Sequence, residues 1–238
     1  MVSLGVYVHI PFCERKCYYC DFYSVVVGDQ GDFAQIAGSY PISFRQVARF
    51  YRKRWGDKPL QTLFLGGGTP TVVPAEKLAS FIIDLKSLLP FVAEPEITIE
   101  ANPNSLTLDA AYILAEAGVT RVSMGVQAFQ DDLLRAIGRV HRVEQIAASV
   151  SSLRQAGIED INLDLMFGLP GQQMTQWVES LQAAVQLAPT HLSCYGLILE
   201  RDTPFDKWYS AGLLDLPSDD QQADMYEVCR TILREAGY

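Results

Sequence analysis

Short apolar runs alternate along the chain with longer stretches in which apolar residues recur every three or four positions. The runs predict six β-strands, at residues 6–10, 62–67, 96–102, 121–127, 160–168 and 191–199. The longer stretches predict amphipathic helices at residues 74–89, 108–118, 143–157 and 177–188, with a last helix from about residue 218. Ala-Gly closes two of these stretches, as expected for a glycine just beyond a helix end.

A strand followed by a helix, repeated six times, predicts βα units and a parallel sheet. Six units are too few for a closed eight-stranded barrel, so we expect an α/β fold of the partial, open (β/α)6 TIM-like type. A doubly wound sheet is the alternative. No linker interrupts the pattern, and we expect one domain over residues 1–238 that ends where a further strand would begin.

Composition and charge narrow the classes of function. The chain has 238 residues, of which 49% are hydrophobic, and a formal net charge of −9. An acidic surface repels phosphate backbones, so nucleic acid is not the expected partner. No apolar run is long enough to cross a membrane, and the first residues lack the basic segment of a signal peptide. Five unevenly spaced cysteines favour a reducing, cytoplasmic location over paired disulfides.

Residues 44–55 are a local exception to the acidic charge. The basic residues there are Arg45, Arg49, Arg52, Lys53 and Arg54. A solvated helix face is the expected structure. The alternative is a docking patch for an acidic protein that donates electrons.

Three of the five cysteines lie within one short segment, CERKCYYC. Cys13, Cys17 and Cys20 have the spacing C-x3-C-x2-C. Three thiolates on one loop suit a [4Fe–4S] cluster with one iron left open for another ligand. A zinc site with His9 as its fourth ligand is the alternative. Cys194 and Cys229 are distant in sequence, and we expect them to be small buried hydrophobic residues.

Polar and glycine-rich positions end several of the predicted strands. The turn GGGTP at 66–70 can expose backbone amides to a carboxylate, although a plain tight turn has the same composition. Glu100, Gln127 and Asp164 fall at successive strand ends. One such acid alone would be a loop cap, but three polar groups at neighbouring strand ends, facing the same opening of the barrel, predict a binding site.

The cysteine spacing after a first strand, with Tyr19 before the last cysteine, resembles the radical S-adenosylmethionine (SAM) superfamily. The resemblance implies a partial barrel over essentially the whole chain. It also implies that Cys13, Cys17 and Cys20 bind the cluster and that SAM occupies the open iron. In that superfamily one electron from the cluster cleaves SAM to a 5′-deoxyadenosyl radical, while the protein orients the cofactor.

Four segments, YVHIPFC, GGGTPT, SMGVQ and DLMFGLPGQ, resemble one branch of the superfamily more closely. That branch contains oxygen-independent coproporphyrinogen III oxidases (dehydrogenases) and HemW-type haem chaperones. The resemblance implies the following SAM-contacting residues: Tyr7, Tyr19, Gly67, Gly68, Thr69, Glu100, Gln127, Arg139 and Asp164. Arg139 would supply a fixed positive charge for a carboxylate, unless it is an exposed arginine at a helix end.

Phe22 separates the two members of this branch. The oxidases have a further cysteine at this position, so its absence favours the chaperones. The expected cargo is then haem, the partners a haem-accepting respiratory protein and an electron donor such as flavodoxin or ferredoxin, and the assembly a homodimer. His141 is a candidate haem-iron ligand, although a surface histidine is the expectation. We expect the C-terminal region of the family to lie outside this chain.

Two alternatives remain open beside the chaperone. The first is oxidative decarboxylation of coproporphyrinogen III, and the second is an RNA-modifying radical SAM enzyme. The sequence alone does not decide whether the chain is an enzyme.

Overall fold

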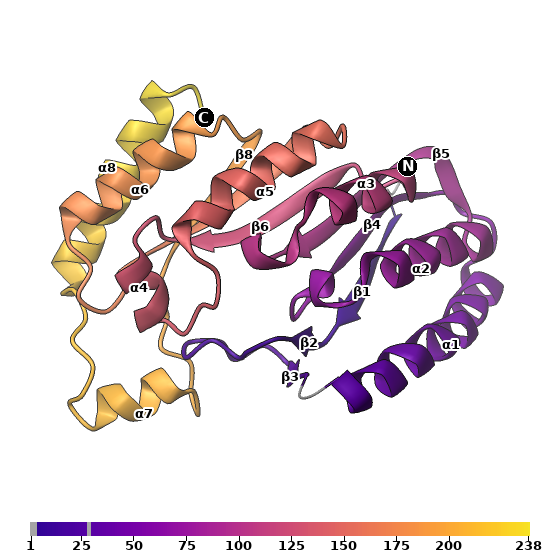
Figure 1. Ribbon diagram of the computed structural model, residues 1–238, viewed down its shortest axis with the longest axis horizontal. Coiled ribbons are helices and arrows are strands. Elements are labelled where there is room, and N and C mark those ends of the chain that lie inside the picture. Colours follow the sequence, from indigo (N-terminus) through magenta and orange to yellow (C-terminus); the bar gives the residue numbers. More distant parts are fainter. Residues whose placement is uncertain (1–3, 28–29) are drawn as a thin grey trace.

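The computed structural model describes residues 4–27 and 30–238 and contains a parallel sheet with strand order β1-β4-β5-β6-β7-β8 (Figure 1). Its strands are β1 (Leu4–Ile10), β4 (Leu60–Gly67), β5 (Phe91–Ala101), β6 (Arg121–Gln127), β7 (Asp160–Phe167) and β8 (His191–Gly196). Each corresponds to a predicted strand. Spatial order follows chain order without a reversal, which a doubly wound sheet would require. The partial (β/α)6 barrel is therefore confirmed, and the doubly wound alternative is wrong.

The main helices follow one another along one side of the sheet (Figure 1). They are α1 (Gln30–Trp55), α2 (Ala75–Leu88), α3 (Leu108–Glu116), α5 (Val143–Gln155), α6 (Met174–Gln186) and α8 (Asp219–Glu235). The four central helices and α8 lie where the periodicity predicts them. In contrast, α1 is much longer than the basic segment that drew attention to it. Among the described residues, no helix is both long enough and apolar enough to cross a membrane.

Several short elements were not predicted, because each is too short to show a period. They are β2 (Phe12–Cys13), β3 (Val25–Val26), α4 (Asp131–Ala136), α7 (Pro204–Ser210) and the 3-10 turns η1 (Pro70–Val72) and η2 (Pro103–Ser105). In Figure 1, α7 lies apart from the row of large helices, and β3 lies near the start of α1. These short elements surround the carboxyl ends of the strands, and their loops shape the site.

The two faces of the sheet differ in chemistry because side chains alternate along each strand. One set of side chains joins the helices in a continuous apolar core, with Leu63, Ile97, Val122 and Ile161 all completely buried. The alternate set is largely polar and faces the concave side. Its members in the last four strands include Thr98, Glu100, Ser123, Asn162, Asp164, Ser193 and Tyr195. The concave face therefore carries the functional groups.

The basic segment of α1 lies at the other end of the strands. The helix ends at Trp55, shortly before β4 begins at Leu60. The carboxyl end of β4 is about 23 Å further on, at about 3.3 Å per residue. Arg45 pairs with Asp84 at 2.5 Å, and Arg52 donates to the carbonyl of Leu88 at 3.0 Å. These contacts fit the expected solvated helix face.

Candidate cofactor-binding site

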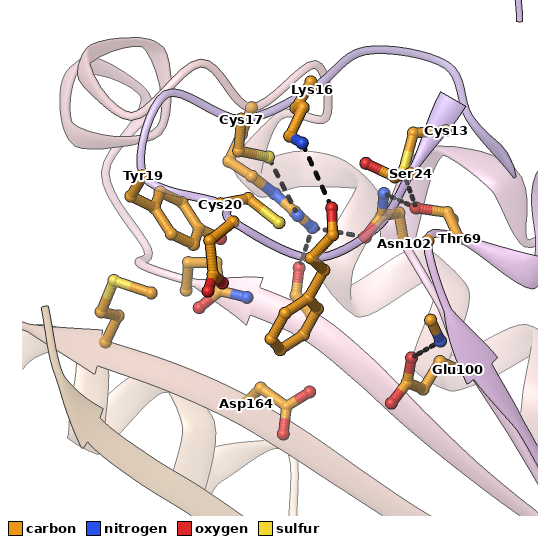
Figure 2. A pocket seen from close by; sticks show the side chains of 18 of the residues that line it. Cys13, Lys16, Cys17, Tyr19, Cys20, Ser24, Thr69, Glu100, Asn102 and Asp164 are labelled. Atoms are coloured by element: carbon orange, nitrogen blue, oxygen red, sulfur yellow. Dashed lines mark hydrogen bonds between the residues drawn. The ribbon is translucent and has the colours of Figure 1, made fainter. Parts of the chain in front are cut away.

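A cavity of about 290 Å³ opens at the carboxyl ends of the strands, beneath the cysteine loop (Figure 2). Its lining brings together all three clustered cysteines and eight of the nine other residues that were expected to contact a cofactor. The lining residues from the prediction are Cys13, Cys17, Cys20, Tyr19, Gly67, Gly68, Thr69, Glu100, Gln127, Arg139 and Asp164. Only Tyr7 of the predicted set does not line the cavity. The cavity is therefore the candidate site.

The cysteine loop is held in place by backbone hydrogen bonds to three distant parts of the fold. The amide of Thr69, in the turn after β4, donates to the carbonyl of Phe12 at 2.7 Å. The amide of Tyr18 donates to the carbonyl of Ile137, at the end of α4, at 3.1 Å. The amide of Phe205, in α7, donates to the carbonyl of Tyr18 at 3.1 Å. The loop position therefore depends on tertiary structure.

The three thiols are partly exposed and form no disulfide. Burial raises the pKa of the Cys13 and Cys20 thiols, so their thiolates need a nearby positive charge. No three His, Cys, Asp or Glu side chains in the described part of the chain converge on a point that could hold a single metal ion. Each ligated iron of a [4Fe–4S] cluster takes one thiolate, so thiols spread around a cavity fit a cluster better than they fit one zinc ion.

His9, the fourth ligand in the alternative zinc site, is engaged elsewhere. Its Nε2 lies 2.8 Å from the carbonyl oxygen of Tyr23, and its Nδ1 lies 3.1 Å from the hydroxyl of Tyr7. The imidazole also packs against the backbone of Gly67. This arrangement gives His9 a structural role beneath the loop.

The glycine-rich turn after β4 is more than a tight turn. Gly67 has φ +117°, which side chains other than glycine rarely adopt, and a Cβ there would lie 2.5 Å from the His9 ring. A Cβ on Gly68 would lie 2.6 Å from the carbonyl oxygen of Phe12 and 3.0 Å from the Cys13 Sγ. Glycine therefore lets the turn pass directly beneath the cysteine loop. The backbone itself becomes part of the cavity wall.

Two carboxylates stand on the concave face of the sheet within the cavity. Glu100 Oε2 accepts a hydrogen bond from the amide of Gly67 at 3.0 Å. Asp164 accepts from Asn162 Nδ2 at 2.7 Å and from Ser123 Oγ at 3.3 Å. Burial raises the pKa of both carboxyl groups. Neither acid is an isolated loop cap, and both can accept hydrogen bonds from a ligand.

Gln127 ends β6 with φ +70°, an uncommon conformation for a residue with a side chain. Its side chain is buried, and its Oε1 accepts a hydrogen bond from the Tyr195 hydroxyl at 2.9 Å. Such strain persists where the surroundings enforce it, and it concentrates at functional sites. This conformation sets the direction of the Gln127 side chain at the cavity.

Arg139 is not the exposed helix-end arginine that was the alternative. Its Nη1 donates to Cys17 Sγ at 3.7 Å, and its Nη2 donates to Asn102 Oδ1 at 2.5 Å and to the carbonyl of Gly125. Burial by itself lowers the pKa of the guanidinium, but Tyr19 and Cys17 raise it above its usual value. In the described part of the chain, none of the ion pairs with a carboxylate includes Arg139. Its charge is therefore directed to the cavity.

His141 corrects the expectation of a surface histidine. It is 3% exposed, and burial together with Arg139 lowers its pKa to about 3. Its Nε2 lies 3.1 Å from the carbonyl oxygen of Val126, and its Nδ1 lies 3.4 Å from Arg139 Nε. Both ring nitrogens are thus occupied, which leaves none for a haem iron. The expectation of an exposed position was wrong because the loop after α4 folds inward and places His141 against Val126 of β6.

The two tyrosines of the prediction differ in position. Tyr19 lines the cavity beside the cysteines (Figure 2). Tyr7 is 57% exposed and does not line it, since its ring packs near Phe64 with centroids 5.9 Å apart. A role for Tyr7 in SAM binding stays a prediction. Outside the site, Cys229 is buried in the core as expected, whereas Cys194 is only partly buried and packs against that core.

Sequence reasoning missed several polar residues at the cavity. Asn102, Ser123 and Tyr195 line it, and Asn162 supports Asp164 from beneath. A signal for three of them was present: Asn102 and Asn162 lie two positions from Glu100 and Asp164, and Ser123 lies directly across the sheet from Glu100. No such signal points to Tyr195, which lies across the sheet from Met166. Residues two apart on a strand share a face.

Comparison with known proteins agrees with this geometry. Residues 7–184 match the radical SAM superfamily. The haem chaperone HemW of Bacillus subtilis is 40% identical over 98% of this chain and 60% of its own length, and that of Escherichia coli is 33% identical over 99% and 60%. The chain thus spans about 60% of the length of these relatives. Coproporphyrinogen III oxidase (HemN) from Escherichia coli superimposes with a TM-score of 0.87 at 30% identity, over 99% of this chain and 53% of that one.

The superfamily match covers most of the chain, and the HemN structure reproduces the whole partial barrel. Together with the thiols, the glycine turn and the polar strand ends around one cavity, these matches settle the family. The chain belongs to the radical SAM superfamily, whose members use a [4Fe–4S] cluster and S-adenosylmethionine as cofactors.

Proposed function

We propose that this chain is the radical SAM part of a haem chaperone that binds haem and transfers it to haem-requiring respiratory proteins. The observation that carries the proposal is the similarity to curated haem chaperones HemW over 98% or more of the chain at 33–40% identity. Phe22 supports it further, because the oxidase branch has a cysteine at that position. Phe22 is 62% exposed at the edge of the cavity, where a thiol would face the ligand.

In this proposal Cys13, Cys17 and Cys20 each give one thiolate to the cluster. Positive charge from Arg139 and the hydroxyl of Thr69 support the thiolates from the cavity wall. When bound, the cluster and SAM supply one-electron chemistry. The protein's contribution is to hold the thiolates, the donors and the acceptors in a fixed arrangement and to limit the access of water.

The remaining cavity groups divide between the two ends of SAM. Arg139 offers a donor that suits the carboxylate, and Glu100 offers an acceptor for the ammonium group. The amides of Gly67, Gly68 and Thr69 are already bonded to Glu100 and to the carbonyls of Ile10 and Phe12, so the turn would contact SAM through its close backbone and not through free donors. Gln127 and Asp164 offer acceptors for hydroxyl groups, while Tyr19 packs beside the cluster. Each of these roles follows from the hydrogen-bonding capacity of the side chain and its place in the cavity.

The proposal also includes partners and a compartment. Haem is the cargo, a respiratory haem protein is the acceptor, and an acidic flavodoxin or ferredoxin is the electron donor. Free thiols at the cavity favour a reducing compartment such as the cytoplasm. The domain proposed here is a single radical SAM core over residues 1–238.

The second candidate function is the oxidative decarboxylation of coproporphyrinogen III. It is favoured by one observation, the superposition on HemN with a TM-score of 0.87. A shared fold is weak support for a shared reaction, because one fold carries many functions. The absence of the further cysteine at Phe22 counts against it.

One anaerobic experiment separates the two candidates. The reconstituted chain is incubated with SAM and a reductant, once with coproporphyrinogen III and once with haem followed by a haem-free acceptor protein. Mass spectrometry follows 5′-deoxyadenosine and decarboxylated porphyrin, and absorption spectra follow haem. The chaperone proposal predicts haem binding and transfer without decarboxylated product. Decarboxylated product from coproporphyrinogen III would overturn it in favour of the oxidase.

A further inference from the structure

A chain of four hydrogen bonds joins two of the three clustered thiols through the cavity wall. Thr69 Oγ1 donates to Cys13 Sγ at 3.9 Å, and Asn102 Nδ2 donates to Thr69 Oγ1 at 3.1 Å. On the other side, Arg139 Nη2 donates to Asn102 Oδ1 at 2.5 Å, and Arg139 Nη1 donates to Cys17 Sγ at 3.7 Å. Figure 2 shows Asn102 beside Thr69, beneath the cysteine loop. Asn102 is the central member of this chain.

The direction of each hydrogen bond follows from the chemistry of the donors. A guanidinium has donors only, so Arg139 requires the carbonyl oxygen of the Asn102 side chain. The Asn102 amide nitrogen must then face Thr69 and donate to its hydroxyl oxygen. A hydroxyl has one proton, and with its oxygen already accepting, that proton is directed to Cys13 Sγ. The charge of Arg139 therefore fixes a donor at a thiol on the far side of Asn102.

The fold holds Asn102 rigidly in this position. It directly follows β5 and precedes Pro103, which restricts its backbone to the extended conformation observed, with φ −108° and ψ 148°. The hydroxyl of Ser105 donates to the main-chain carbonyl of Asn102 at 2.9 Å. Gly125 leaves the space that the pair needs, because a Cβ there would lie 3.0 Å from Arg139 Nη2 and 3.3 Å from Asn102 Oδ1. Backbone and neighbours thus pre-organise the amide.

We propose that Asn102 is a positioning residue that sets the reduction potential of the cluster by orienting the Thr69 hydroxyl toward Cys13. The inference rests on the proposed cluster ligands. Hydrogen bonds to the sulfur ligands are among the factors that set iron–sulfur potentials. A donor at a thiolate stabilises the more negative, reduced cluster and so raises its potential. Asn102 itself touches neither a thiol nor the reacting atoms, and it acts through Thr69 and Arg139.

The test uses Asn102→Asp, which is close in size and keeps the acceptor for Arg139. A carboxylate has no proton to donate, so it accepts the Thr69 hydroxyl proton and turns that proton away from Cys13. The cluster is reconstituted anaerobically in the full chain, and its midpoint potential is measured by a redox titration followed by electron paramagnetic resonance. We expect the potential to fall, with a change of about tenfold in the reduction equilibrium, or about 59 mV for one electron.

A double-mutant cycle separates orientation of the hydroxyl from the added negative charge. Thr69→Val removes the hydroxyl, and in that background Asn102→Asp should lower the potential clearly less than in the wild-type background. An equal shift in both backgrounds, or no shift in either, would overturn the inference. Asn104→Ala is the matched control, since Asn104 donates to Glu14 at 2.7 Å and takes no part in the chain of bonds.

Other measurements keep the two proposals distinguishable. If the wild-type chain assembles no cluster, the proposed ligands and this inference are both overturned. If the wild type holds a cluster and Asn102→Asp has the same midpoint potential, the inference alone is overturned. If Asn102→Asp does not retain a cluster, the midpoint potentials of Thr69→Val and Thr69→Ser test the effect of the same hydroxyl. The inference requires a lower potential for valine and a potential near that of the wild type for serine. The opposite result would overturn it.

Discussion

The backbone amide of Gly67 donates a hydrogen bond to Glu100 Oε2 at 3.0 Å, which links the turn after β4 to the end of β5. Gly67 also passes so close to His9 that no side chain fits between them. A single glycine thus connects the first strand, the glycine-rich turn after β4 and a cavity carboxylate.

Gly67→Ala should destabilise the chain for two separable reasons. Its φ of +117° costs a residue with a side chain about 1–2 kcal/mol, and the contact of 2.5 Å with His9 adds about 1–3 kcal/mol of overpacking. The free energy of unfolding is measured in urea. Gly171→Ala is the control, because Gly171 has φ +71° with nothing within 4 Å of its Cβ position. Equal losses for the two variants would show that the His9 contact carries no cost.

Cys17→Ser should abolish assembly of the iron–sulfur cluster. Loss of an outer partner of a metal ligand already costs about 10–100-fold in affinity, so loss of a thiolate is expected to lower the iron content at least tenfold. Iron and acid-labile sulfide are measured after anaerobic reconstitution. Cys194→Ser, which changes a thiol packed against the core, should retain both. Equal iron content in the two variants would contradict the proposed ligands, and zinc without sulfide in the wild type would contradict the cluster.

Asp164→Asn should affect SAM binding and stability in different ways. Burial raises the pKa of the Asp164 carboxyl above its ordinary 3.8, so the group stabilises the fold while protonated. That contribution is lost as the pH rises through the folded-state pKa. The variant without ligand should therefore lose less stability than the wild type between acidic and neutral pH.

For SAM, the same variant should bind about tenfold more weakly at neutral pH, the loss expected for one hydrogen bond to a charged acceptor. Calorimetric titration measures the affinity, and urea unfolding at several pH values measures the stability. Asp57→Asn, which neutralises an acid 84% exposed in its side chain, controls for net charge. An unchanged SAM affinity in Asp164→Asn would remove Asp164 from the site.

His141→Gln should remove part of the acid sensitivity of the fold. The pKa of His141 is about 3 in the folded chain against an ordinary 6.5, because of burial and the nearby Arg139. Below about pH 6.5 His141 is therefore protonated in the unfolded chain but stays neutral in the folded chain. The free energy of unfolding falls with falling pH as a result, by at most about 1.4 kcal/mol per pH unit for this one group.

Unfolding in urea between pH 7 and pH 4 measures this slope, and glutamine keeps a donor for the carbonyl of Val126. The variant should show a shallower loss of stability than the wild type over that range. Identical slopes would mean that His141 is protonated in the folded chain. In the same variant haem binding should be unchanged, since both imidazole nitrogens are engaged within the protein.

The sequence by itself determined the strands, the large helices and the identity of the clustered thiols. Strands such as β6 and β7 have apolar runs bounded by turns, and helices such as α2 and α5 have a clear period, so local chemistry was sufficient. The parallel sheet then placed Glu100, Gln127 and Asp164 at one edge, because carboxyl ends of successive parallel strands meet there.

Only the tertiary structure decided what the loops do. Arg139 and His141 follow a helix of six residues, too short to show which face is buried, and the fold turns both inward. Tyr7 belongs to the YVHIPFC segment but does not line the cavity, and its ring lies near Phe64. Asn102 gained its importance from Thr69 and Arg139, which lie 33 and 37 positions away along the chain. Such contacts depend on how separate βα units are packed, and a periodic pattern holds no information about partners so far apart.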